Sequence, residues 1–393
     1  MARKRSKKKS RKEKKGRGEV QRKHRRSFWI AGLLSVGLLG GIYFSPLGAL
    51  LHLPGTSDRT EAAKYYALGG MYLEHQRYDE AILAYQKALN ADPNYVEAYG
   101  DMGIAYAKLK KFADAQQCLT KAIGLDPKYA AAYSNLGMVY AEQDRFDDAI
   151  AQYKIGLRLR PTFGELHYNL GRAYSKQGRY DEAGEEYKQA LALNTNFPEA
   201  HYSLGRIYAG RGDLKEAAAR FKRAIQLKSD HANARYRLGL VYAKQGKYDD
   251  AISEYEHAVR IDPDHVKAHY NLGNVYMRQG RTEEGQKALA LFEALSEYLK
   301  KVKRIENTIK QDPDKPEAYY WLGEAHTARG RYARAIEAFT RALRVDPEFA
   351  PAYRALGDVY RQQNMPEKAR ANYERAVEIV LKKRRSSNVP QER

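Results

Sequence analysis

A pattern of 34 residues recurs along most of this 393-residue chain. One copy, at residues 232–265, reads ANARYRLGLVYAKQGKYDDAISEYEHAVRIDPDH. Both halves place small and aromatic residues at spacings of three and four, as one side of a helix requires. Gly246 separates the halves, and Asp262-Pro263 ends the second, because proline cannot continue a helix. Each copy is therefore expected to form a helical hairpin that cannot bury its apolar sides alone.

The same residues return in register in the neighbouring copies. The glycine at position 239 recurs at 34-residue steps as Gly69, Gly103, Gly137, Gly171, Gly205 and Gly273. Seven repeats span residues 62–300, and two more surround Gly323 and Gly357, so that the array ends near residue 381. A 34-residue period with this pattern resembles the tetratricopeptide repeat (TPR). The resemblance implies an all-α fold, a TPR α-solenoid in which helical hairpins form a right-handed superhelix.

The seventh repeat departs from the pattern. Its closing Pro313 comes 16 residues later than the period predicts. Apolar residues in this stretch are spaced by four and three, at Ala288, Phe292, Leu295, Leu299 and Val302. We therefore predict an extended second helix in repeat seven, a helical extension over residues 301–315, and repeats eight and nine over 316–381. Two hypotheses follow for the apolar stripe: it contacts a partner or a second copy, or it packs against the last two repeats.

The charge of the chain is concentrated at its two ends. Of a formal net charge of +21, residues 1–27 contribute 15 Lys and Arg against 2 Asp and Glu. Residues 382–393 contribute 5 basic residues against 1 acidic residue. Residues 1–27 are too charged to form a core, so we predict a disordered basic tail there and a basic C-terminal tail at 382–393. The basic composition is therefore no evidence that the repeats themselves bind nucleic acid.

Residues 28–51 contain no charged side chain, and 24 residues in a helix suffice to cross about 30 Å of hydrocarbon. Trp29 and Tyr43 lie towards the two ends, where interfacial aromatic residues are common. We predict an uncleaved transmembrane anchor followed by a linker at 52–61. The alternative is a cleaved signal peptide, although Leu47 makes a poor cleavage site before a cut after Ala49.

The flanks of the anchor predict its orientation. Since positive charge remains cytoplasmic, the basic N-terminus is expected in the cytoplasm and the repeats in the periplasm or another extracytoplasmic space. Gly37, Gly41 and Ser45 fall at every fourth residue, a spacing that would allow two anchors to pack closely as a homodimer.

No constellation for catalysis is present in the sequence. There is no phosphate-binding glycine loop, no zinc-type cluster, and no nucleophile paired with a base, so we expect no enzyme activity, cofactor or metal. Cys118 is alone and follows the pattern of a core residue. The sequence thus favours a membrane-anchored scaffold resembling bacterial inner-membrane TPR proteins. Alternatives are a substrate-docking subunit of an enzyme complex such as a protein glycosyltransferase, or a basic tail that contacts anionic lipid, with nucleic acid disfavoured.

The resemblance also implies where a protein partner lies. In this family, positions two, five, six, nine, twelve and thirteen of each repeat line a concave groove. In repeats one to three these positions hold Glu74, Glu97, Asp101 and Glu142 against Lys108. In repeats four to seven they are mostly basic or aromatic, against Glu165 and Glu199. The predicted partner-binding residues there are Tyr168, Asn169, Arg172, Lys176, Tyr202, Arg206, Tyr236, Arg237, Lys244, Lys267, Tyr270, Asn271, Asn274 and Arg278.

These residues predict an extended, acidic partner segment, because guanidinium and ammonium groups beside tyrosine rings suit such a ligand. The family's best-known clamp holds a C-terminal carboxylate with a lysine at position five. No repeat of this chain has lysine there, so a partner of that kind is not expected.

Overall fold

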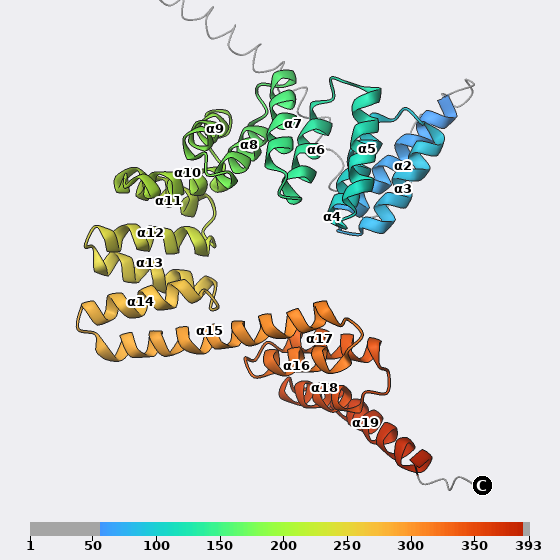
Figure 1. The fold of residues 1–393 in the computed structure, drawn as a ribbon, viewed down its shortest axis with the longest axis vertical. Helices are drawn as coiled ribbons and strands as arrows, with labels where there is room; N and C mark the ends of the chain where they lie inside the picture. The colour runs from blue at the N-terminus through green and yellow to red at the C-terminus, as the bar shows by residue number, and fades with distance from the viewer. Residues whose placement is uncertain (1–55, 388–393) are drawn as a thin grey trace, which may run out of the picture.

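The computed structural model describes residues 56–387, which fold into 18 α-helices and no strand. The helices alternate as the first and second members of successive hairpins (Figure 1). The first helices are α2 (Thr56–Glu74), α4 (Val96–Lys108), α6 (Ala130–Glu142), α8 (Gly164–Lys176), α10 (Pro198–Arg211), α12 (Ala232–Lys244), α14 (Val266–Arg278), α16 (Pro316–Thr327) and α18 (Ala350–Gln362). The second helices are α3 (Tyr78–Ala91), α5 (Phe112–Leu125), α7 (Phe146–Leu159), α9 (Tyr180–Leu193), α11 (Leu214–Leu227), α13 (Tyr248–Ile261), α15 (Thr282–Gln311), α17 (Tyr332–Val345) and α19 (Pro366–Ser387).

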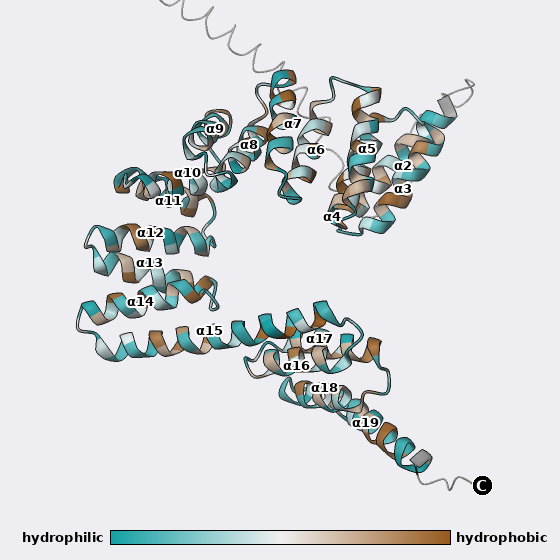
Figure 2. Cartoon of the chain, viewed as in Figure 1, coloured by the Kyte–Doolittle hydropathy of each residue, from teal (hydrophilic) through white to brown (hydrophobic). Residues whose placement is uncertain are grey.

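Close crossing of the two helices explains the recurring glycine. A Cβ atom added at Gly239 would lie 2.6 Å from Cε1 of Tyr255, a ring that is fully buried. The turn between the helices favours a second glycine, because Gly246 adopts a φ of +74°, although Lys110 adopts a similar φ of +59° at the same position of repeat two. Hydrophobic and hydrophilic residues are interspersed along the helices (Figure 2), and buried apolar residues of α12, α13, α14 and α15 form one cluster.

The hairpins stack into an open arc that runs from α2 to α19 (Figure 1). The first helices of most successive repeats pack directly against one another, for example α4 against α6 and α10 against α12. The second helices pack mainly against the first helices on either side of them. Helices that touch along a curved stack lie on its inner side, so the first helices line the concave face.

The helix α15 is 30 residues long, whereas most other second helices have 14. Its first part packs against α14, and its second part packs against α16, where the hydroxyl of Tyr298 lies 2.8 Å from Nδ1 of His326. Leu295 and Val302 are buried by these contacts, although Leu299 remains exposed. Val302 packs with Leu322 and Ala325 of α16, as the second hypothesis requires, whereas Ala288 packs against residues of α14. Contact of the exposed Leu299 with a partner or a second copy stays a prediction.

Two predicted boundaries are also wrong. The helix α2 begins at Thr56, inside the predicted linker at 52–61, since residues 56–61 contain no proline or glycine and Asp58 favours the positive end of a helix. At the other end, α19 continues to Ser387, into the predicted basic tail. Position 381 is Leu where the preceding repeat has Pro347, so nothing stops the helix there.

The predicted tail at 1–27, the anchor at 28–51, and its Gly37, Gly41 and Ser45 lie outside the described residues. Within residues 56–387, no helix is both long and apolar enough to cross a bilayer.

Candidate functional site

All fourteen predicted partner-binding residues lie on first helices of repeats four to seven, on α8, α10, α12 and α14. The cations Arg172, Lys176, Arg206, Lys244 and Lys267 are exposed. The concave face is therefore lined by a series of basic side chains that rigid helices hold in place.

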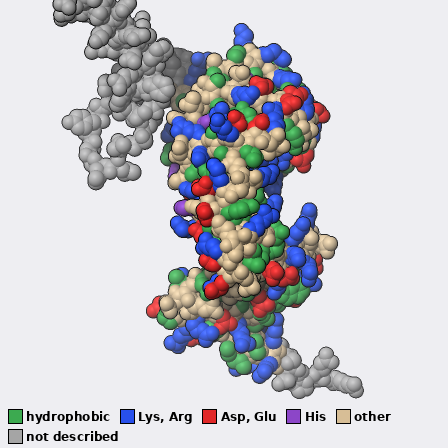
Figure 3. Space-filling view, turned by 90° about the vertical axis from the view of Figure 1, so that its left-hand side faces the viewer, with side chains coloured by type: hydrophobic (Ala, Val, Ile, Leu, Met, Phe, Trp, Pro, Cys, Tyr) green, Lys and Arg blue, Asp and Glu red, His purple; other side chains and the backbone are tan. Residues whose placement is uncertain are grey.

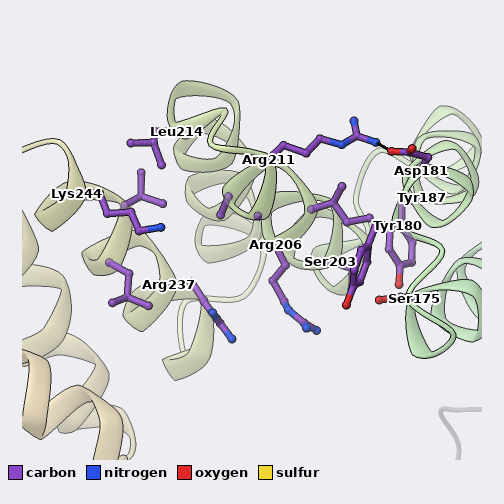
Figure 4. Close-up of a pocket in the computed structure, with 16 residues that line it drawn as sticks. Ser175, Tyr180, Asp181, Tyr187, Ser203, Arg206, Arg211, Leu214, Arg237 and Lys244 are labelled. Carbon is purple, nitrogen blue, oxygen red and sulfur yellow. Dashed lines mark hydrogen bonds and ion pairs between the residues drawn. The ribbon is translucent and has the colours of Figure 1, made fainter.

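Three of the predicted partner-binding cations line one hollow of about 620 Å³, which lies between the α8–α9 turn, α10 and α12. Arg206 comes from α10, and Arg237 and Lys244 come from α12. The guanidinium groups of Arg206 and Arg237 extend in the same direction, as Figure 4 shows. Cations from neighbouring helices are thus presented together to one ligand.

These three cations have no carboxylate partner among residues 56–387. Other arginines of the same region are paired: Arg211 with Asp181, and Arg235 with Glu254 at 3.1 Å. The side of the molecule shown in Figure 3 carries blue and red side chains intermingled. The hollow therefore contains three cations without a carboxylate partner beside the paired Arg211 and Asp181, which also line it.

Three of the four predicted tyrosines, Tyr168, Tyr202 and Tyr236, are buried or half-buried, whereas Tyr270 is exposed. The ring of Tyr168 lies 5.7 Å from that of Tyr187 and 4.7 Å from that of Phe197, and Tyr236 is only 7% exposed. Burial raises the pKa of Tyr168 despite the opposing charge of Arg172, so its hydroxyl stays protonated at neutral pH. Tyr168, Tyr202 and Tyr236 thus pack against rings of their own repeat and of the segment that leads into the next one.

Arginines of the groove lie against these rings. The guanidinium carbon of Arg172 is 5.8 Å from the ring centre of Tyr168, and that of Arg206 is 6.0 Å from the ring centre of Tyr202. At such distances the negative ring face attracts the cation. The tyrosines thereby position cations that have no ion-pair partner.

The predicted asparagines use their amide groups internally. Nδ2 of Asn271 donates to the carbonyl of Lys267 at 2.8 Å, and Nδ2 of Asn274 donates to the carbonyl of Tyr270 at 2.9 Å. Their Oδ1 atoms are the parts with which these side chains would accept bonds from a ligand. No hydrogen bond within residues 56–387 orients the side chain of Asn169 in this way.

The acidic groove residues of repeats one to three differ in their exposure and hydrogen bonding. Oδ2 of Asp101 accepts a hydrogen bond of 2.8 Å from the hydroxyl of Tyr66, and burial raises the pKa of this carboxyl. The side chains of Glu74, Glu97 and Glu142 are exposed. The sign of charge therefore changes along the concave face, from acidic in the first repeats to basic in the fourth to seventh.

The described residues offer no obvious reactive centre. Burial raises the pKa of the Cys118 thiol to about 11, so that it stays protonated and unreactive. Among residues 56–387, no cluster of three or more His, Cys, Asp and Glu side chains is placed to hold a metal ion.

Two serines of the hollow were not predicted. Ser175 and Ser203 line it beside Arg206. They occupy groove positions twelve and six of their repeats. Because serine has neither a charge nor an aromatic ring, only this position in the repeat could have identified them.

The geometry defines an α-solenoid of helical hairpins with a polar concave face. A family model of the C-terminal domain of cilia and flagella-associated protein 70 matches residues 51–236. Models of the tetratricopeptide repeat match residues 241–280, 266–297 and 314–382. The chain belongs to the tetratricopeptide repeat family, whose folds are typical of protein-interaction scaffolds.

Solved structures with similar folds include MamA, which is 32% identical over 41% of this chain and 95% of MamA, with a TM-score of 0.40. YrrB, described as a TPR protein with an unusual peptide-binding site, is 28% identical over 47% of this chain and 95% of YrrB, with a TM-score of 0.41. PilF of Pseudomonas aeruginosa is 20% identical over 53% of this chain and 95% of PilF, with a TM-score of 0.50. No curated protein sequence matches the chain significantly.

Proposed function

We propose that this protein is a non-catalytic, membrane-anchored scaffold whose repeats four to seven bind an extended acidic segment of a partner protein. The observation that carries the proposal is the hollow in which Arg206, Arg237 and Lys244 converge without carboxylate partners among the described residues. A cation that already has an intramolecular partner gains little from a ligand. An unpaired one gains a charge-assisted hydrogen bond.

Charge reversal tests the proposed groove. The double variant Arg206→Glu and Arg237→Glu replaces two attractions by two repulsions. At the high dielectric of an exposed groove this is worth about 2 kcal/mol, or about thirtyfold in Kd. Binding of a glutamate-rich peptide, measured by fluorescence anisotropy, is expected to weaken by that factor and to weaken in the wild type as salt increases.

The matched control is the double variant Lys215→Glu and Arg260→Glu. It changes the net charge equally in the same two repeats, but on the second helices α11 and α13. Its affinity is expected to stay near that of the wild type. If both double variants lose the same affinity, the net charge of the protein and not the groove determines binding. Unchanged affinity in the groove variant would refute the proposal.

The proposed location rests on the sequence. The anchor at 28–51 and the basic flank of residues 1–27 favour a cytoplasmic N-terminus with the repeats on the opposite side of the membrane. A single cysteine at exposed Ser253, in a Cys118→Ser background, is expected to react with a membrane-impermeant maleimide added to intact spheroplasts. Labelling that requires lysis would overturn this orientation.

A further inference from the structure

The fifth position of a repeat carries a tyrosine whose ring is held between two other rings in five repeats. One ring comes from the second helix of the same repeat, and the other from the residue that precedes the next first helix. The ring sets are Tyr66 with Tyr85 and Tyr95, Tyr168 with Tyr187 and Phe197, Tyr202 with Phe221 and His231, Tyr236 with Tyr255 and His265, and Tyr320 with Phe339 and Phe349.

Tyr270 in repeat seven lacks both of these neighbours: the residue 19 positions later, aromatic in the five other repeats, is Leu289, and Phe292 lies three residues further along α15. Its ring lies 5.0 Å from that of Phe292, and no second ring contacts it among residues 56–387. The residue that would supply the second ring is Lys315, which precedes α16 and extends over Trp321 instead, with Nζ 5.5 Å from that ring centre. The sequence therefore has a lysine where five other repeats supply a ring.

The long helix α15 explains why the position stays open. Its 16 additional residues move the start of α16 by about 24 Å along the helix axis. In Figure 1, α14 lies along one end of α15 and α16 along the other. As a result Tyr270 is 47% exposed, while the enclosed Tyr236 is 7% exposed.

The surroundings of the open ring face are basic. Lys267 lies one turn before Tyr270 on α14, and Arg278 lies two turns after it, so both share its side of the helix. Both are exposed, and neither has a carboxylate partner in the described part of the chain. A cationic ligand would be repelled here, whereas an aromatic side chain flanked by carboxylates would not.

We propose that Tyr270 forms a binding slot for one aromatic side chain of the acidic partner segment. This inference rests on the function proposed above and adds a sequence requirement to it. The partner's ring takes the place that a ring of the next repeat takes beside the other tyrosines, and its acidic flanks face Lys267 and Arg278. The slot thereby sets the register of the segment along the groove.

The test uses peptides of alternating glutamate and serine that carry one central tryptophan, phenylalanine, leucine or alanine. Their affinities for the full-length protein are measured by fluorescence anisotropy of a terminal label. An added ring pair is expected to favour the tryptophan and phenylalanine peptides over the leucine peptide by about three- to tenfold. The variant Tyr270→Leu is expected to abolish this preference, and Tyr270→Phe to keep it.

The variants also separate this inference from the proposed function. Equal affinity of the aromatic and leucine peptides for the wild type refutes the slot alone. A preference that survives in Tyr270→Leu, with an unchanged circular dichroism spectrum, refutes it as well. If no acidic peptide binds the wild type, the proposed function fails and the slot fails with it.

Discussion

Two adjacent glycines of α2 provide a sharp test of the packing. Gly69 and Gly70 share one helix, and the same substitution to alanine is expected to have opposite effects. A Cβ atom at Gly69 would lie 2.5 Å from Cε1 and 2.6 Å from Cδ1 of Tyr85. At Gly70 it would meet no atom within 4 Å.

The expected magnitudes follow from these distances. Tyr85 is fully buried, so its ring cannot move aside without displacing its neighbours. Overpacking of this kind costs about 1–3 kcal/mol, of which the higher helix propensity of alanine offsets about 0.5–1 kcal/mol. We therefore expect Gly69→Ala to destabilise by up to about 2.5 kcal/mol and Gly70→Ala to stabilise by about 0.5–1 kcal/mol.

Urea unfolding followed by circular dichroism measures the difference. Because a terminal repeat can open by itself, hydrogen exchange of α2 and α3 amides should accompany it. Exchange in Gly69→Ala is expected to be faster than in the wild type, and in Gly70→Ala slower. Equal stability of the two variants would show that the helices do not cross as closely as the structure indicates.

Three further changes test other features. Leu295→Ala truncates a side chain of α15 that is only 1% exposed, so unfolding should require about 2–5 kcal/mol less by urea titration. Lys110→Gly is expected to raise stability by about 0.5 kcal/mol in the same titration, because Lys110 has a φ of +59°. Burial lowers the pKa of His231 and His265 below the usual 6.5, and Nδ1 of each accepts a backbone N–H at the start of a helix. Stability from these groups is complete above about pH 6.5 and is lost as pH falls below it, since the unfolded chain takes up protons first. Melting temperatures recorded from neutral to acidic pH should therefore fall less in the double variant His231→Asn and His265→Asn, which keeps a capping acceptor.

Much of the fold could be predicted because every repeat must satisfy the same local constraints. Gly239 marks the helix crossing, where it contacts Tyr255, and Gly246 marks the turn, where its φ is positive. Pro263 follows the end of the second helix at Ile261. Where such a local signal is missing, prediction failed. The basic residues after Leu381 indicated a tail, yet a helix persists there because Lys382 and Lys383 contact Glu348.

The candidate site was less predictable, since pairing between helices depends on geometry that no single repeat contains. Arg211 and Arg206 are both exposed arginines of α10, but only Arg211 meets an aspartate of the preceding repeat. The open ring face of Tyr270 likewise depends on where α16 lies along α15. Spacing predicted the long helix but not the displacement of its neighbour.

Photo-crosslinking tests the central claim, partner binding in the concave groove, most directly. A photoreactive phenylalanine is introduced at Lys244, which lines the hollow on α12, or at exposed Ser253 on α13 as the control. After irradiation of cells that contain the full-length protein, the account predicts adducts with a partner from position 244 and none from position 253. The adducts should disappear when Arg206→Glu and Arg237→Glu are added. Adducts that form from position 253 alone, or that persist in the charge-reversed protein, would contradict it.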